Sequence, residues 1–310
     1  MNTGGSKTRI VPHGYVGILV IVLAEGLLFG GNQLVGHWFT PIVWTGYILF
    51  VDALVYGFSA RSLLMTDRME FVIIALISIG VWWLFEFYNA PRFWKSGLEL
   101  WWHYHNLEPN LFLRRVGYDW AFATISPAMF ATAELLTTTL FKRQPPRAAI
   151  KFSKTALIVM AVAGMAGASV PLVFPSEWFA PVVWLAFILL LDPVNAMRGQ
   201  PSISGDLVRG NWRRLWALLL SGLVCGVLWE FWNYWALTKW TYTVPFFGHV
   251  KIFEMPVLGF LGFPPFAVEC WVMYIFLRSL LESKRTSPQA SSGDIYVRAQ
   301  EERKQSTAQV

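Results

Sequence analysis

Residues 38–52, WFTPIVWTGYILFVD, return at residues 178–192 as WFAPVVWLAFILLLD. Eight of these fifteen positions are identical, including the proline, the second tryptophan and the final aspartate of each stretch. A second match follows, in which LFEFYN at 84–89 resembles LWEFWN at 228–233. A third and weaker one pairs FATAE at 130–134 with PFAVE at 265–269. Because the matches keep their order along the chain, we expect an internal duplication.

The amino-acid composition indicates whether the chain folds in water or in a lipid bilayer. The chain of 310 residues is 55% hydrophobic and only 14% charged, whereas soluble domains carry about 25% charge. Apolar runs recur from one end to the other, which predicts an integral membrane protein with an all-α fold, because lipid offers backbone groups no hydrogen-bonding partner. The two cysteines, Cys225 and Cys270, lie inside such runs and predict no disulfide framework.

The apolar runs divide into eight predicted transmembrane helices, four in each half of the chain. We expect a first repeat at 1–145, a second at 146–283, and a polar, disordered cytoplasmic tail at 284–310. An even number of spans per unit inserts both halves in the same direction, so the repeats should be related by a pseudo-two-fold axis along the membrane normal. The predicted spans lie at about 14–31, 40–57, 70–88, 118–140, 154–174, 178–194, 213–235 and 260–280.

Basic residues predict the orientation of these spans. With the N-terminus in the cytoplasm, 19 of the 25 lysines and arginines fall on the cytoplasmic side, in agreement with the positive-inside rule. Both termini are therefore expected in the cytoplasm, as in a multi-pass protein of a bacterial inner membrane. The net charge of +6 follows from loop position and requires no nucleic-acid partner.

Carboxylates inside predicted spans are the first candidates for function, because charge at bilayer depth is costly and usually faces a bundle interior. In Glu86-x-x-Asn89 and Glu230-x-x-Asn233, spacing of three residues places carboxyl and amide on one helix face. A carboxyl whose charged form is disfavoured by apolar neighbours is suited to general-acid catalysis. The alternative is a structural role, in which these groups bond across helices. The other carboxylates within spans are Glu25, Asp52, Glu134, Asp192 and Glu269, of which Asp52 and Asp192 are expected to have structural roles at helix ends.

Two loops on the non-cytoplasmic side add further candidates. The stretch 239–269 is apolar and rich in proline and glycine, so we expect an interfacial loop and then a helix that starts near Pro265 and carries Glu269. The other loop contains His103, His105 and Glu108, whose side chains can ligate a metal. We regard them as weak metal candidates, and interfacial hydrogen bonding is the alternative. The sequence contains no phosphate-binding loop or dinucleotide-binding motif, so no cofactor is expected.

Trp240-Thr-Tyr242, the proline-glycine stretch and Pro265-Phe-Ala-Val-Glu269 together resemble the bacterial membrane carotenoid cyclases of the lycopene cyclase domain family. The resemblance covers about thirty residues. It implies proton-initiated chemistry on an isoprenoid, with Glu269 and Glu134 as acids. Two features depart from the family: a single Glu269 followed by Cys270 replaces paired acidic residues, and each unit has an additional span.

Three functional hypotheses follow. The first is an intramembrane enzyme that cyclises, hydrates or isomerises a lipid or isoprenoid, with acid–base and orienting groups from both repeats. The second is a proton- or cation-coupled carrier or channel in which the repeats move around a central site. The third is a structural subunit of a larger membrane complex. Divergence between the loops after 88 and after 235 favours the enzyme, since one competent site suffices. The expected catalytic residues are Glu86, Asn89, Glu134, Glu230, Asn233 and Glu269, and the expected substrate-binding residues are Trp232, Trp240 and Tyr242.

Overall fold

The computed structural model describes residues 10–90, 99–245, 247–281 and 294–298, which are mostly helical. The long helices are α1 (Pro12–Phe29), α3 (Phe39–Ser59), α4 (Arg68–Asn89), α5 (Leu111–Thr138), α6 (Lys154–Val173), α7 (Ala180–Met197), α9 (Arg213–Trp235) and α10 (Phe263–Leu281). The shorter elements are α2 (Gln33–His37), η1 (Glu177–Phe179), α8 (Ile203–Val208), η2 (Val257–Gly262), β1 (Trp102–His105), β2 (Lys239–Tyr242), β3 (Lys251–Ile252) and β4 (Met255–Pro256).

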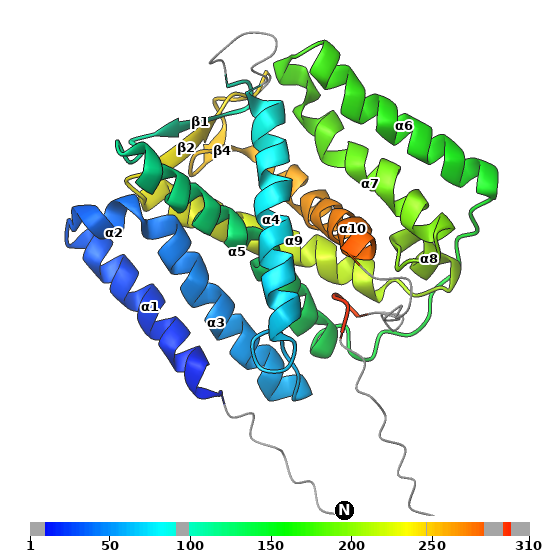
Figure 1. The fold of residues 1–310 in the computed structure, drawn as a ribbon, viewed down its shortest axis with the longest axis horizontal. Helices are drawn as coiled ribbons and strands as arrows, with labels where there is room; N and C mark the ends of the chain where they lie inside the picture. The colour runs from blue at the N-terminus through cyan, green and yellow to red at the C-terminus, as the bar shows by residue number, and fades with distance from the viewer. Residues whose placement is uncertain (1–9, 91–98, 246, 282–293, 299–310) are drawn as a thin grey trace, which may run out of the picture.

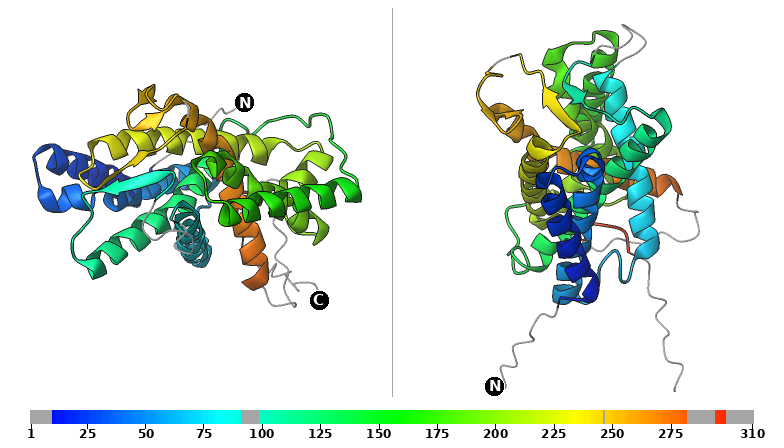
Figure 2. Two further views of the ribbon diagram at one scale, coloured as in Figure 1. Left: turned by 90° about the horizontal axis from the view of Figure 1, so that it is seen from above. Right: turned by 90° about the vertical axis from the view of Figure 1, so that its left-hand side faces the viewer.

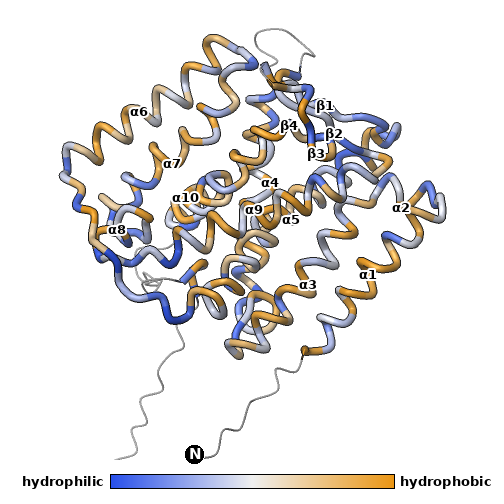
Figure 3. Tube along the Cα trace, turned by 180° about the vertical axis from the view of Figure 1, so that it is seen from behind, coloured by the Kyte–Doolittle hydropathy of each residue, from blue (hydrophilic) through white to orange (hydrophobic). Residues whose placement is uncertain are grey.

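Seven of the described helical segments are long and apolar enough to cross a membrane. They cover every predicted span except 118–140, which falls in α5. This helix contains Arg114, Arg115, Asp119 and Glu134, together with several threonines. Nearly all of its residues from Phe122 to Glu134 are buried, and its exposed large apolar side chains, such as Phe112 and Val116, lie in the first part of the helix. Hydrophobic residues follow the helices, and hydrophilic ones gather in the connections (Figure 3).

The helices form two outer groups around a central one (Figure 1). α1 packs on α3, and α6 packs on α7, while α4, α5, α9 and α10 contact one another in the middle. Seen from above, α1–α3 and α6–α7 lie on opposite sides of α10 (Figure 2). Contacts of α5 with α9, and of α4 with α10, join the two halves of the chain. The halves therefore share one core and do not form separate bundles.

Glycines permit the closest helix approaches. A Cβ atom on Gly17 of α1 would lie 2.5 Å from the carbonyl oxygen of Gly46 on α3, and one on Gly164 of α6 would collide with the backbone of Leu190 on α7. Small residues at such crossings are typical of helix packing in membranes, where close van der Waals contact replaces the hydrophobic effect.

One end of the bundle contains the strands, and the other contains the described ends of the chain (Figure 1). At the strand end, β1 pairs antiparallel with β2. The predicted loop 239–269 folds into β2, β3, β4 and η2, and α10 begins at Phe263 with both following prolines in its first turn. The expected helix start near Pro265 is therefore confirmed.

Part of the predicted tail is packed against the opposite end. Ile295, Tyr296 and Val297 are buried, and Trp271 of α10 donates its indole hydrogen to the carbonyl oxygen of Ile295. Arg298 forms an ion pair with Glu134. The expectation of a wholly disordered tail is wrong for residues 294–298, because these apolar side chains fill the core. The rest of the tail, 282–293 and 299–310, lies outside the described residues.

Candidate functional site

The two asparagines of the Glu-x-x-Asn motifs hold the strands in place. Asn89 accepts hydrogen bonds from the backbone N–H groups of Trp101 and Trp102 and donates one to the carbonyl oxygen of Trp102. Asn233 accepts from the backbone N–H of Trp240 at 2.9 Å and donates to its carbonyl oxygen at 2.8 Å. Both amides are fully buried. Each is therefore bound to a strand backbone, which supports the structural alternative for Asn89 and Asn233.

The two glutamates bind aromatic side chains of these strands. Oε1 of Glu86 accepts hydrogen bonds from the indole N–H of Trp82 at 2.8 Å, that of Trp102 at 3.2 Å and the hydroxyl of Tyr104 at 2.5 Å. An oxygen that accepts three hydrogen bonds has little capacity left for another partner. Glu86 thus orients three rings.

Glu230 has fewer partners. Its Oε1 accepts one hydrogen bond, at 2.6 Å, from the hydroxyl of Tyr242, whose oxygen in turn accepts the indole N–H of Trp240 at 2.5 Å. The second carboxyl oxygen of Glu230 is buried and has no hydrogen-bond partner within the described part of the chain. A chain of hydrogen bonds therefore runs from Trp240 through Tyr242 to a carboxyl with one free oxygen.

The tyrosines on β1 and β2 remain hydrogen-bond donors over a wide pH range. Burial raises the pKa of Tyr104 well above its usual value, and the negative charge of Glu86 adds to this effect. Burial, and then the charge of Glu230, does the same for Tyr242. A phenol next to a carboxylate resists ionisation because two negative charges would lie within hydrogen-bonding distance.

The strand register relates the two halves in a crossed manner. Trp102 lies opposite Tyr242, and Tyr104 lies opposite Trp240, with His103 and Thr241 between them. The sequence Trp-x-Tyr thus occurs on both strands, at 102–104 and at 240–242. This fourth correspondence was missed in the sequence analysis, where the loops were taken to have diverged. That argument for an enzyme therefore loses its basis.

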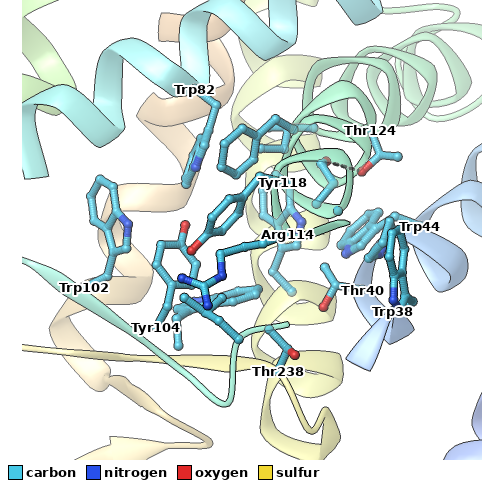
Figure 4. A pocket seen from close by; sticks show the side chains of 18 of the residues that line it. Trp38, Thr40, Trp44, Trp82, Trp102, Tyr104, Arg114, Tyr118, Thr124 and Thr238 are labelled. Carbon is cyan, nitrogen blue, oxygen red and sulfur yellow. Dashed lines mark hydrogen bonds between the residues drawn. The ribbon is translucent and has the colours of Figure 1, made fainter. Parts of the chain in front are cut away.

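Beside the strands lies a cavity of about 140 Å³ between α3, α4, α5, α9 and α10. Its wall is predominantly aromatic, and the close-up shows rings from several elements converging on it (Figure 4). Because their N–H and O–H groups are directed toward Glu86, Trp82, Trp102 and Tyr104 contribute mainly ring surface to the wall. The aromatic lining residues are Trp38, Trp44, Trp82, Trp102, Tyr104, Tyr118, Phe122, Trp184, Trp229, Trp240, Tyr242, Phe263 and Phe266.

Two of the three predicted substrate-binding residues, Trp240 and Tyr242, line the cavity. The third, Trp232, does not. It packs between Trp44 and Tyr47 at ring-centroid distances of 5.0 and 6.1 Å, and its indole N–H is donated to Glu25. The expectation of substrate contact at Trp232 is not supported, because its ring is enclosed by other side chains. This contact also accounts for Glu25, which thereby finds a partner within the bundle.

The carboxyl groups of Glu134 and Glu269 neither line the cavity nor bind a described residue that does. Glu134 is near the end of α5 that faces the tail segment and is paired with Arg298. Glu269 is fully buried on α10, where Oε1 accepts from the backbone N–H of Phe187 at 3.3 Å and the other oxygen has no partner in the described residues. The six expected catalytic residues therefore do not form one constellation.

The paired aspartates bind the backbone of the turns that follow their helices. Asp52 accepts hydrogen bonds from the hydroxyl of Ser62 and the N–H of Leu64. Asp192 accepts from the N–H groups of Ile203 and Ser204. Both contacts match the structural role that was expected.

The weak metal candidates do not converge. His103 contacts Thr243 at 2.7 Å, and His105 contacts Thr241 at 2.8 Å, across the strands. Glu108 accepts the backbone N–H of Asn110. Within the described residues, no group of three or more histidine, cysteine, aspartate or glutamate side chains is placed to hold a metal ion. The interfacial hydrogen bonding considered as the alternative accounts for both histidines.

Several cavity residues were not identified as site residues in the sequence analysis, notably Trp82, Trp102, Tyr104 and Arg114. The Trp-x-Tyr match was a usable signal for two of them. Arg114 looked like an ordinary basic loop residue, and only the path of α5 brings it to the cavity. Comparisons of the chain with protein-family models, with curated proteins and with solved structures find no match.

Proposed function

We propose that this protein is an intramembrane enzyme that binds the apolar part of a lipid or isoprenoid in the aromatic cavity and transfers a proton to it from Glu230 through Tyr242. The observation that carries this proposal is the hydrogen-bond chain from the cavity wall to a buried carboxyl with one unpartnered oxygen. Glu86, whose Oε1 already accepts three hydrogen bonds, is assigned to positioning the rings.

The proposed step conserves protons. Tyr242 gives its phenolic proton to a double bond or oxygen of the substrate, while the protonated form of Glu230 returns a proton to the phenolic oxygen and becomes a carboxylate. Positive charge that develops on the substrate is stabilised by the faces of the surrounding rings. Loss of a proton from the product, or from an added water molecule, returns a proton to Glu230. Isomerisation, cyclisation and hydration are the reaction classes that fit.

The resemblance to the carotenoid cyclase family is consistent with this substrate class, since Trp240 and Tyr242 line the cavity. The resemblance implied Glu269 and Glu134 as the acids, whereas our proposal assigns this role to Glu230. None of Glu134, Glu230 and Glu269 lines the cavity, but Glu230 is hydrogen-bonded to the lining residue Tyr242. Glu134 is paired with Arg298 and Glu269 with the backbone of Phe187, so we assign the donor role to Glu230.

We further propose that the chain is a duplicated four-helix unit with eight spans and with both termini in the cytoplasm. Three observations support the duplication: the equivalent helix contacts in the two halves, the equivalent hydrogen bonds of Asn89 and Asn233, and the crossed pairing of the Trp-x-Tyr stretches. The eighth span would be α5, surrounded by its neighbours. The excess of basic residues at the end opposite β1 and β2 supports the orientation.

The test is a comparison of membrane lipids by mass spectrometry. Cells that express wild type should contain a product absent from cells with Glu230→Gln or Tyr242→Phe, with either the precursor's mass or that mass plus one water. Tyr104→Phe is the matched control, because Tyr104 is the equivalent tyrosine and is bound to the positioning glutamate. Identical lipid profiles in all four preparations, with correctly folded protein, would eliminate the enzyme.

A carrier is the second candidate, and the position of the cavity between equivalent residues such as Trp44 and Trp184 favours it. Uptake by proteoliposomes in the absence of any chemical change in the transported compound would establish this alternative.

A further inference from the structure

Arg114 is the only arginine or lysine among the described residues that line the cavity, and its charge bears on what can bind there. We propose that the ligand is amphipathic and carries an anionic phosphate or carboxylate group that binds Arg114, while its apolar chain lies against the rings. This inference rests on the proposed function and specifies the substrate class of the same site.

Arg114 lies in the first turn of α5 and lines the cavity. The close-up shows it among Tyr104, Tyr118 and Thr238 (Figure 4). Its Nε donates to the carbonyl oxygen of Glu108 at 2.7 Å, which fixes the plane of the guanidinium. No carboxylate of the described residues forms an ion pair with it. The terminal N–H groups therefore remain for another acceptor.

The adjacent arginine shows the opposite arrangement. Arg115 is exposed, its Nε lies 2.8 Å from Asp119, and its guanidinium is 4.1 Å from the ring of Trp83. Asp119 neutralises Arg115, whereas Arg114 has no such carboxylate among the described residues although its side chain is the less exposed of the two. A guanidinium in a partly dehydrated site binds phosphate or carboxylate strongly, because its parallel N–H groups match two oxygens.

The remaining lining restricts the rest of the ligand. Most of the wall is aromatic, and its other polar groups are His37, Glu108, Thr40, Thr124 and Thr238. The carboxyl of Glu108 accepts the backbone N–H of Asn110 and forms no ion pair with Arg114 among the described residues. A small hydrophilic anion would leave these rings without a partner, whereas a fully apolar molecule would leave Arg114 without one. An anionic head joined to an unsaturated chain satisfies both parts of the cavity.

The experiment uses the purified full-length protein in mild detergent, with tryptophan fluorescence as the readout, because seven of the lining residues are tryptophans. Geranylgeranyl monophosphate, geranylgeraniol and inorganic phosphate are titrated separately. We expect the monophosphate to bind about tenfold or more tightly than the alcohol, with no saturable response to free phosphate. Arg114→Gln should reduce affinity for the monophosphate to that for the alcohol, and Arg115→Gln should change neither.

Arg114→Lys retains the charge and should keep part of the preference, which tests the inference should the glutamine variant fail to fold. Equal affinity of wild type for the alcohol and the monophosphate would contradict the inference that the ligand carries an anionic group. It would leave the proposed function of the cavity intact. Tight binding of free phosphate that is lost in Arg114→Gln would contradict the inference that the anionic group belongs to a lipid. The site would then be one for a soluble anion. Absence of binding by either isoprenoid would remove this inference together with the proposed isoprenoid substrate.

Discussion

Trp102 pairs with Tyr242 across β1 and β2, and the side chains of both residues are bound to glutamates, Glu86 for Trp102 and Glu230 for Tyr242. Each strand is fixed to its own half by an asparagine at the end of a long helix. The position of the cavity wall therefore depends on buried polar contacts behind it as well as on packing between rings.

Removing either asparagine should destabilise the protein. Asn89→Ala leaves two backbone N–H groups and one carbonyl without their partner, and Asn233→Ala leaves one of each. Buried groups that lose a partner cost about 1–3 kcal/mol each, so Asn89→Ala should have the larger effect on apparent unfolding temperature in detergent. The exposed Gln33→Ala is the control, and equal melting of all three variants would contradict the structural role.

Glycine contacts between α1 and α3 give a second prediction. Gly17→Ala should lower the free energy of unfolding by about 1–3 kcal/mol, as overpacking does, because the added Cβ would collide with α3. Gly26→Ala on the same helix has open space around its Cβ, and should be neutral or slightly stabilising. Thermal unfolding measures both, and the reverse order would show that α1 and α3 approach differently.

The tail segment gives a third prediction. Arg298→Gln leaves Glu134 buried without its cation, which should cost about 3 kcal/mol. The double variant Glu134→Gln with Arg298→Gln should recover much of this loss because no charge remains unpaired. A double-mutant cycle on thermal unfolding measures the coupling. Strict additivity of the two single changes would mean that residues 294–298 are not bound there in solution.

Crossing of the membrane by α5 can be tested by labelling. In a background with Cys225→Ala and Cys270→Ala, Pro109→Cys and Lys142→Cys place thiols on either side of α5. A membrane-impermeant maleimide added to intact cells should label the first and not the second. Labelling of both from the same side would give seven spans and would place the termini on opposite sides.

Alkaline pH provides the fifth prediction. The pKa values of Tyr104 and Tyr242 are raised in the folded protein, so folding is favoured while these phenols stay protonated. Above about pH 10 the unfolded chain loses protons that the folded chain retains, and stability falls as pH rises. Wild type and the double variant Tyr104→Phe with Tyr242→Phe should gain the same phenolate absorbance between about pH 9 and 11, because neither tyrosine ionises in that range in the folded protein. Loss of two tyrosines' worth of absorbance in that range would contradict the raised pKa values.

Seven of the eight long helices in the described part of the chain were predictable because each contains a local apolar run, and proline in the first turn accounts for the boundaries at Pro12 and Phe263. The spacing in Glu86-x-x-Asn89 predicted a carboxyl and an amide on one helix face, and both side chains are bound to Trp102. What they bind was not predictable, because Trp102 and Tyr242 are 140 positions apart and meet only through the tertiary path of both halves. Likewise, nothing local distinguishes Arg114 from Arg115.

The crossed pairing of Trp102 with Tyr242 and Tyr104 with Trp240 is self-complementary. A strand that carries Trp-x-Tyr can therefore pair in this register with an identical copy of itself, as in an isologous dimer. Under the proposed duplication, a single four-helix protein would have closed the same cavity as a homodimer. Fusion in tandem would then have left each copy free to change alone, in keeping with a Glu86 that binds three donors and a Glu230 that binds one.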